Sequence, residues 1–564
     1  MVRTHLIRIF ILFFAWVPIA LAAALSINIT GIKGDVLDNV KSRLTELYQG
    51  ESFNQDAKEQ VRKQIETAMY PYGYFAPRIR ILSKTQKSLT AHINPGPQIK
   101  VTSLSIELTG AGKHDLRILK ARHALPLKPG KPFINSQYKE AKEALLNAAE
   151  HQGYLHGKFT TSEVLIDKQK YTVNIKIIFD TGPQYFFGQV RFDPTYVCPE
   201  LLYRYVPFQP GQPYSTDQIL AFESNLSSSG YFKSVVVKPN IDTKSDVPVD
   251  VHLERIHRIN YTLGVGYGTD TGPRGRAALH VTPVNRRGHK FNAIAQGSAK
   301  ENALLAQYLI PGRNPLLDNY SLTGSVSNLD YSSGYGNAFQ LSLAHQHATK
   351  RHQRTLSING LVERFNYTYQ PKTTKSLLFP KAIFAWTKTT DPLFSPSGYN
   401  LTLTGLAAGK FALSEINMGQ ATLDAKAAIT VDAIRTRFFA HTIQGLTGIQ
   451  NINDLPLSLA MLLGGAQNLQ GYGYNSIGPG KYMTYGGIEI QKETWDKWYV
   501  VGFVDAGDVY KPTPRLLKYD AGVGLMWVSP VGPIKVALAQ PLDNHFQRVS
   551  GSNPRLVINM GPDL

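Results

Sequence analysis

This chain of 564 residues lacks long hydrophobic runs and is nearly free of cysteine. No stretch of 18 consecutive apolar residues follows the N-terminal segment, although 43% of all residues are hydrophobic, so no transmembrane helix is expected. The single cysteine, Cys198, excludes an internal disulfide and a cysteine-based metal cluster. Glycine and aromatic residues are plentiful instead, with 47 Gly, 29 Tyr and 25 Phe. This composition is typical of alternating β-strands, in either a membrane barrel or a large soluble sandwich.

Signatures of catalysis are also missing. The sequence has no Gly-x-Ser-x-Gly elbow, no phosphate-binding loop and no His-Glu-x-x-His pair. His252 and His257 lie near each other without further ligands, and Asp505 and Asp508 stand in a glycine-rich β pattern. We therefore expect no enzyme activity, no cofactor and no metal site.

The first residues predict a secretory signal. Arg3 and Arg8 flank the start of an apolar stretch, and small residues around Ala22 supply a cleavage site, which gives a signal peptide over residues 1–22. The net charge is +19. Because an exported protein does not meet nucleic acid, the excess charge indicates anionic lipid headgroups or acidic partners. Scattered solubilising charge is the alternative.

The first half of the chain repeats. A triplet of glycine, tyrosine and a large apolar residue recurs at spacings of 80 and 77 residues: Gly73-Tyr74-Phe75, Gly153-Tyr154-Leu155 and Gly230-Tyr231-Phe232. Each triplet follows a stretch of helical periodicity and precedes two alternating stretches. The glycine lets the helix end with a positive φ, so that the chain can turn back.

Each repeat therefore predicts the order strand, helix, helix, strand, strand. This pattern resembles the POTRA domain, with three copies over residues 25–97, 98–184 and 185–256. An extended client could add a strand to an exposed edge of such a small sheet. The domains could equally be rigid spacers.

From residue 257 onward the helical period disappears and strands alternate. Ala421, Leu423 and Ala425 share one face of such a strand, while Asp424 and Lys426 share the other. A strand with one apolar and one charged face suits lipid outside and water inside. Strands in lipid must pair all their backbone groups and therefore close into a barrel. At roughly 19 residues per strand and connection, residues 257–564 predict an all-β, 16-stranded antiparallel transmembrane barrel.

The last hundred residues resemble a known family. The segments Phe503–Asp508 and Gly522–Ile534 are similar to the barrel of the outer-membrane assembly family that includes BamA, TamA and the two-partner secretion transporters. Three POTRA copies, the segment Asn285–His289 and the closing Gly561–Leu564 resemble the TamA branch most. The resemblance covers essentially the whole mature chain.

The resemblance also implies a loop that reaches into the barrel lumen. Its motif, a hydrophobic residue followed by Arg-Gly-Tyr in the family, corresponds to Leu469-Gln470-Gly471-Tyr472. The family arginine meets acidic groups such as the one matching Asp505. With Gln470 in that place, we expect a hydrogen bond to Asp505 without charge assistance.

The two strands that close the barrel carry weakening residues. Gly264, Gly266 and Gly268 alternate in the predicted first strand, and Gly561 and Pro562 fall in the predicted last strand, from about Leu556 to Leu564. Glycine packs poorly against neighbouring strands, and proline cannot donate to a ladder. We expect either a gate that opens laterally or a glycine face that makes room for the inserted loop.

The resemblance implies an insertase in the outer membrane of a Gram-negative bacterium, with its POTRA arm in the periplasm. Its clients would be unfolded autotransporter-like and other β-barrel proteins. The implied partners are a long periplasm-spanning protein like TamB and the outer-membrane lipids. The alternatives are a two-partner-type polypeptide secretion channel, a component of lipid transport and a passive porin.

Overall fold

The structure is a computed structural model. It describes residues 26–47, 57–84, 88–241, 245–391, 393–410, 413–511, 517–530, 532–542 and 553–561. The predicted signal peptide, residues 1–22, lies outside this set, as does Pro562. The described chain forms two compact units, and the division between them passes through the third of three small α/β domains.

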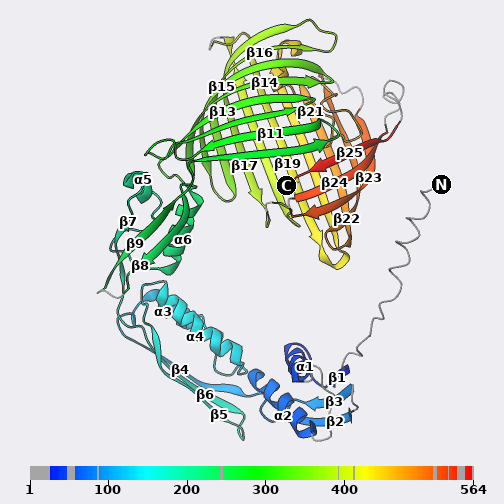
Figure 1. The fold of residues 1–564 in the computed structure, drawn as a ribbon. Coiled ribbons are helices and arrows are strands. Elements are labelled where there is room, and N and C mark those ends of the chain that lie inside the picture. The colour runs from blue at the N-terminus through cyan, green and yellow to red at the C-terminus, as the bar shows by residue number, and fades with distance from the viewer. Residues whose placement is uncertain are drawn as a thin grey trace, which may run out of the picture. The chain divides into compact units, whose positions relative to one another are not determined.

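The three α/β domains share one element order, strand, helix, helix, strand, strand, as the repeats predict (Figure 1). In each domain the third strand lies in the centre of the sheet, between the first strand and the second. The first domain contains β1 (Ser26–Thr30), α1 (Asp35–Leu47), α2 (Ala57–Met69), the 3-10 helix η1 (Tyr70–Tyr72), β2 (Arg78–Lys84) and β3 (Ser88–Asn94). The second contains β4 (Lys100–Thr109), α3 (Leu116–His123), α4 (Asn135–Glu150), β5 (Lys158–Asp167) and β6 (Thr172–Asp180). The third contains β7 (Phe186–Phe192), α5 (Pro199–Tyr203), α6 (Thr216–Ser228), β8 (Phe232–Pro239) and β9 (Asp246–Arg255).

The apolar stripe of the second helix builds the core of each domain. In the first domain Val61, Ile65 and Met69 are fully buried, one or two turns apart on α2. The glycine of each repeated triplet adopts a positive φ, +82° at Gly73 and +83° at Gly153, directly after the helical segment. This is the left-handed conformation that glycine adopts without steric cost, so the predicted turn is confirmed.

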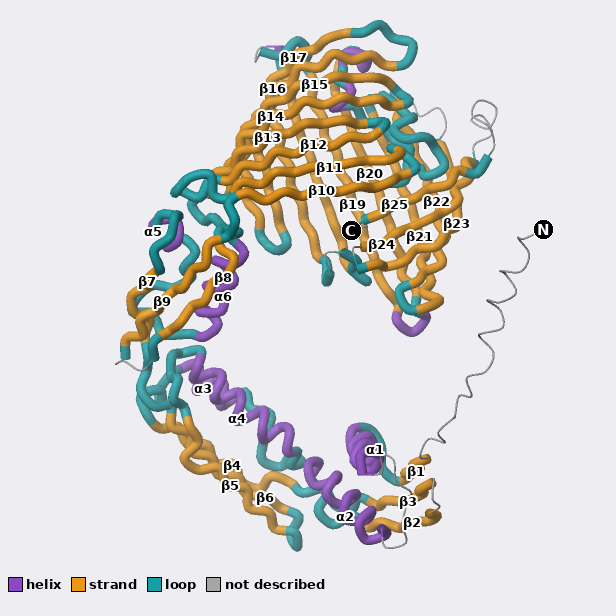
Figure 2. Tube along the Cα trace, viewed as in Figure 1, coloured by secondary structure: helices purple, strands orange, loops and turns teal. Residues whose placement is uncertain are grey.

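The remainder of the described chain forms one 16-stranded antiparallel sheet curved into a barrel, which confirms the predicted fold class (Figure 2). The sheet order follows the chain order from β10 to β25. Its strands are β10 (Ile259–Gly268), β11 (Gly272–Val281), β12 (Lys290–Ser298), β13 (Glu301–Pro311), β14 (Asp318–Tyr331), β15 (Gly334–Ala348), β16 (His352–Tyr367), β17 (Thr373–Lys388), β18 (Gly398–Ala408), β19 (Met418–Val431), β20 (Thr436–Ile449), β21 (Tyr482–Trp495), β22 (Trp498–Tyr510), β23 (Lys518–Ser529), β24 (Gly532–Pro541) and β25 (Arg555–Met560).

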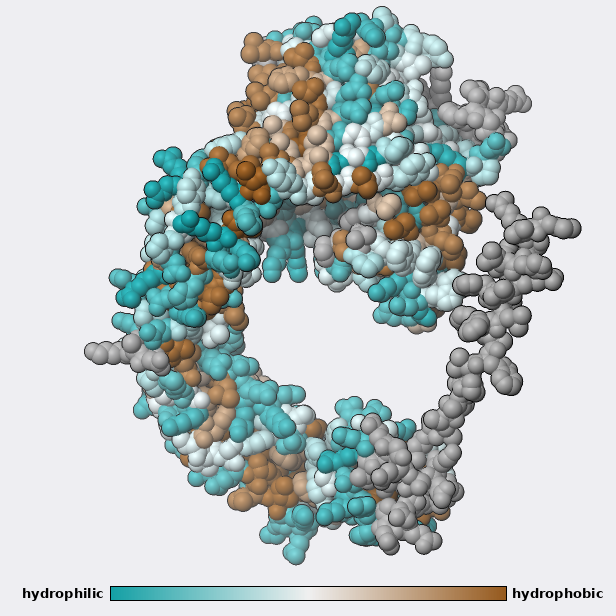
Figure 3. Space-filling model, in the orientation of Figure 1, coloured by the Kyte–Doolittle hydropathy of each residue, from teal (hydrophilic) through white to brown (hydrophobic). Residues whose placement is uncertain are grey.

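Side chains alternate between the two faces of the barrel wall. Leu341, Leu343 and Ile429 are outward-facing and exposed, whereas Asp424 on β19 is hydrogen-bonded to His441 of β20 at 3.0 Å. Figure 3 shows hydrophobic side chains gathered over parts of the outer face of the wall. An apolar outer face beside a polar inner face is the arrangement of a barrel that lipid surrounds. Among the described residues, no helix is long and apolar enough to cross a membrane.

The predicted last strand needs a correction. The prediction runs from about Leu556 to Leu564, but β25 ends at Met560. Gly561 follows the strand with a φ of +120°, and its N–H donates to Pro533 O at 3.1 Å. Because this conformation is not extended, Gly561 ends the strand and does not weaken it from within.

Candidate functional site: the barrel seam and the lumen loop

The seam is the place where β10 and β25 approach each other. The ladder runs without interruption from β10 to β25, but no strand pairing joins these two ends in the described chain. β10 has 10 residues and β25 only 6, whereas β14 to β17 have 14 to 16. The seam is therefore the place in the sheet where the backbone ladder is missing.

The glycines of the predicted gate lie on the inner face of β10. Gly264 pairs with Arg276 and Gly266 with Arg274 across the hairpin to β11. The other face carries large apolar residues, with Leu263 82% and Val265 97% exposed. β10 thus has an apolar outer face and an inner face on which the glycines leave few side-chain atoms. Both faces adjoin the free edge of the strand.

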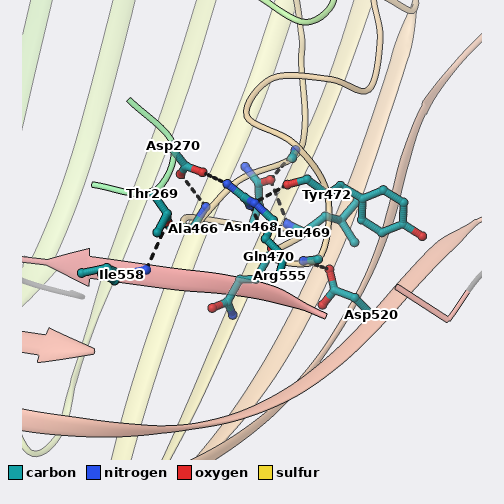
Figure 4. Close-up of polar contacts among 12 residues, drawn as sticks. Thr269, Asp270, Ala466, Asn468, Leu469, Gln470, Tyr472, Asp520, Arg555 and Ile558 are labelled. Atoms are coloured by element: carbon teal, nitrogen blue, oxygen red, sulfur yellow. Dashed lines mark hydrogen bonds and ion pairs between the residues drawn. The ribbon is translucent and has the colours of Figure 1, made fainter. Parts of the chain in front are cut away.

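Side chains bridge the seam where the backbone does not (Figure 4). Arg555 at the start of β25 forms an ion pair with Asp270, in the turn between β10 and β11, and both side chains are largely buried. The backbone N–H of Ile558 donates to Thr269 Oγ1 at 3.1 Å. The tip of the first hairpin therefore holds the last strand through two side chains.

Asp270 and Arg555 also bind the lumen loop, which consists of residues 450–481 between β20 and β21. Arg555 Nη1 donates to the carbonyl oxygens of Gln470 at 2.9 Å and Tyr472 at 2.7 Å. Asp270 Oδ2 accepts from the N–H of Ala466 at 2.7 Å. We call the Asp270–Arg555 pair, with these three loop contacts, the latch. It joins the first hairpin, the last strand and the loop at one point (Figure 4).

The predicted loop motif lies inside the barrel. Leu469 and Tyr472 are buried, and the N–H of Tyr472 donates to Leu469 O at 3.1 Å, which closes a tight turn. The N–H of Gly471 donates to Asp520 Oδ2 at 2.8 Å. A Cβ on Gly471 would lie 2.9 Å from Asp520 Cβ, so this glycine permits the close approach of loop and wall.

Gln470 makes the hydrogen bond expected of it. Its Nε2 donates to Asp505 Oδ2 at 3.2 Å, and Tyr485 Oη donates to Asp505 Oδ1 at 2.8 Å. Asp505 and Asp520 are direct partners across β22 and β23. Gln470 Oε1 is buried without a hydrogen-bond partner among the described residues. The loop thus meets Asp505 with a neutral amide and Asp520 with a backbone N–H, while the guanidinium bound to the loop belongs to Arg555 of β25.

The loop also forms hydrogen bonds with the barrel wall outside the latch. Glu363 of β16 accepts from the N–H of Ser458 at 3.2 Å and from its hydroxyl at 2.5 Å. Tyr367 Oη donates to Leu455 O at 2.7 Å, and Tyr474 Oη donates to Glu301 of β13 at 2.9 Å. These contacts tie the loop to β16 and to β13, so its place in the lumen does not depend on the latch alone.

Sequence reasoning missed the latch. Its two charged members are separated by 285 residues, and neither belongs to a recognisable motif. The one available signal is that Arg555 alternates with Leu556 at the start of a terminal strand, which places a charge on the inner face.

The segment Asn285–His289 also has a defined environment. It forms the turn between β11 and β12, and Gly288 O accepts from Tyr231 Oη of the third repeated triplet at 2.7 Å. The N–H of Cys198 donates to Arg286 O at 2.8 Å. Burial raises the pKa of the Tyr231 phenol well above its usual value, so this hydroxyl remains a donor.

Across the described residues, no group of three His, Cys, Asp or Glu side chains is placed to hold a metal ion. The absence of enzyme activity stays a prediction.

Comparisons with known proteins agree with this architecture. Residues 285–561 match the Omp85 superfamily domain. Residues 26–95 match the first POTRA domain of TamA, and residues 105–182 and 185–255 match the POTRA model described as a surface antigen variable number repeat. A curated relative, the outer membrane protein assembly factor BamA of Neisseria meningitidis serogroup B, is 24% identical over 251 residues. That match covers 41% of this chain and only 31% of the relative's length.

A solved structure of a BamA protein has a similar fold. BamA from Haemophilus ducreyi lacking POTRA domains 1–3 has a TM-score of 0.68 at 15% identity, covering 82% of this chain and 99% of that one. CdiB from Escherichia coli has a TM-score of 0.45 at 13% identity, covering 79% and 87%. The chain belongs to the Omp85 superfamily of POTRA-bearing barrels, and it lies in the outer membrane of a Gram-negative bacterium with its POTRA domains in the periplasm.

Proposed function

We propose that this protein assembles β-barrel clients, autotransporter-like proteins among them, by offering the free edge of β10 to a client strand. The observation that supports the proposal is the seam itself. An unpaired strand edge exposes backbone donors and acceptors that a further strand can satisfy without sequence specificity. Among the described residues, the side chains of Asp270 and Thr269 connect the first hairpin with the side chain of Arg555 and the backbone N–H of Ile558 on β25.

The driving force need not come from a nucleotide. A client gains backbone hydrogen bonds as its strand pairs, and it buries its apolar face as it enters lipid. The exposed outer face of β10, with Leu263 and Val265, already has the polarity of the lipid-facing wall. A client strand paired there in register would place its own apolar face on the same side.

The lumen loop argues against a passive porin. Buried apolar residues of the loop, such as Leu455, Leu457 and Leu463, pack in clusters with residues of the wall. A loop held by packing and by several hydrogen bonds restricts the lumen, so steady conduction of small solutes is not expected.

The POTRA domains support docking of a TamB-like partner that spans the periplasm, because each has a small sheet with edges of its own. Outer-membrane lipids contact the apolar outer wall.

Depletion of the protein, followed by quantitative proteomics of isolated outer membranes, tests the function. We expect a defined set of β-barrel proteins to be lost from the membrane and their precursors to accumulate in the periplasm. An unchanged inventory of barrels would contradict the proposal. Loss of one secreted protein from the medium, with membrane barrels intact, would instead identify a secretion channel. A changed lipid composition with normal barrels would identify lipid transport.

A further inference from the structure

The inner face of the first hairpin carries two arginines that pair with no carboxylate among the described residues. Arg274 and Arg276 on β11 are both exposed, and no ion pair or hydrogen bond engages either side chain in that part of the chain. The nearby carboxylates are already used. Asp270 pairs with Arg555, and Glu301 accepts from Tyr331 and Tyr474.

A cavity of about 390 Å³ lies beside these arginines. Its lining includes Gly264 and Gly266 of β10, Arg274 and Arg276 of β11, and Met560 at the end of β25. The cavity therefore adjoins the free edge of β10 on one side and two guanidinium groups on the other.

Gly264 keeps the path between the edge and Arg276 open, whereas the side chain of Arg274 lies over Gly266, with its Nε 2.9 Å from where a Cβ would stand. A Cβ on Gly264 would meet no atom within 4 Å. Neighbouring strands lie about 4.8 Å apart, so a strand added to β10 stands about 10 Å from β11. An inward-facing carboxylate of that strand and the long side chain of Arg276 can bridge this distance over Gly264, the residue paired with Arg276.

We propose that Arg274 and Arg276 form a carboxylate-binding site that selects client strands with an Asp or Glu on the lumen-facing side. Guanidinium groups bind carboxylates through paired, charge-assisted hydrogen bonds, which suits this ligand. The site rests on the proposed function, since its ligand arrives on a strand paired with β10. It adds selectivity to pairing that the backbone alone would make unselective.

Disulfide capture of a synthetic strand tests the site. The full-length protein with Cys198→Ser and Val265→Cys, in lipid nanodiscs, is mixed with ten-residue peptides of alternating apolar and polar residues. Each peptide carries an outward-facing cysteine and either Glu or Gln at one inward position. We expect the Glu peptide to be captured about fivefold more than the Gln peptide. Arg274→Gln with Arg276→Gln should reduce this preference to less than twofold.

Two variants control the experiment. Arg364→Gln removes an exposed arginine from the outer face of β16 and should leave the preference unchanged. Gly264→Val fills the path without touching either arginine and should abolish it.

Equal capture of the two peptides would overturn the carboxylate site while leaving strand addition intact. Failure to capture either peptide would instead contradict the proposed function. A preference that follows the free C-terminus and vanishes on amidation would also overturn the proposal, because the ligand would then be the terminal carboxylate. A preference that survives in the double arginine variant would do the same.

Discussion

The middle of the barrel wall and its seam are built from the same kind of strand and are held in different ways. Between β14 and β17 each strand of 14 to 16 residues pairs with both neighbours in an unbroken register. At the seam the backbone contributes no ladder between β10 and β25, and the ends are joined through Asp270, Arg555 and Thr269. A ladder opens only by losing many bonds together, whereas a latch of a few side chains can open by itself.

The lumen loop is held both by the middle of the wall and by the seam. Glu363 and Tyr367 of the middle wall hold one half of the loop, and the latch holds the other half. If the latch opened, the loop would keep its contacts with the middle wall. The seam could therefore open without expulsion of the loop from the lumen.

The largest expected effect comes from locking the seam. Thr269→Cys with Ile558→Cys, in a Cys198→Ser background, should form a disulfide when oxidised and abolish client assembly, because β10 can no longer leave β25. Leu304→Cys with Val326→Cys, a paired position of β13 and β14, should leave assembly intact. The measurement is assembly of a reporter barrel, followed by protease protection before and after reduction, and it is compared between the two disulfide variants. Normal assembly with the seam locked would refute opening at this place.

Removal of the latch cation should loosen the seam and leave the wall intact. Arg555→Gln leaves Asp270 largely buried without its partner and two loop carbonyls without a charged donor, at a cost of roughly 2–3 kcal/mol. Hydrogen exchange should accelerate in β25 and in residues 466–472, with little change in β14 to β17. Asp270→Asn should show the same pattern to a smaller degree, since the amide still accepts from Ala466. Uniform acceleration over the whole barrel would show that Arg555 has a general structural role.

Restoring the family's arginine in the loop should have a smaller, opposite effect. Gln470→Arg places a cation beside Asp505 and Asp520 and should stabilise the barrel by about 1 kcal/mol. The readout is the temperature at which the folded form disappears in a semi-native gel. Gln470→Leu removes a donor from Asp505 and should lower that temperature. A decrease for Gln470→Arg would mean that the site is too tightly packed for the longer side chain.

The smallest expected effect concerns the turn between β11 and β12. Tyr231→Phe removes the hydrogen bond to Gly288 O and should cost about 1 kcal/mol, because the buried carbonyl loses its donor. Tyr154→Phe at the equivalent place of the second repeat is the matched control. Hydrogen exchange in residues 284–290 should rise for Tyr231→Phe alone. Equal responses would show that the contact with the turn contributes nothing particular.

Much of the architecture follows from periodicity. A helix face such as Val61, Ile65 and Met69 must be buried, and a strand with alternating apolar residues must have two different faces. The turn glycines of the repeats are equally local, because a positive φ at the end of a helix limits the choice of residue. The element order of the repeats, the strand count and the two-faced wall could therefore be predicted.

The seam could be predicted only in part. The glycines of β10 and the loop motif are local features, and the bond from Gln470 to Asp505 follows from their chemistry. The predicted end of β25 was wrong, because Gly561 has a positive φ and its N–H donates to Pro533 O of the neighbouring strand β24.

The sequence by itself determined which segments are helices and strands, which faces are apolar, and that the chain is a row of POTRA domains followed by a barrel. Only the tertiary structure decided that the described strands β10 and β25 are not paired with each other and that Arg555 meets Asp270 there. The physical reason is the separation along the sequence between the residues that interact. Local patterns are set by residues a few positions apart, whereas the latch joins residues 285 positions apart that meet only when the sheet curves back on itself.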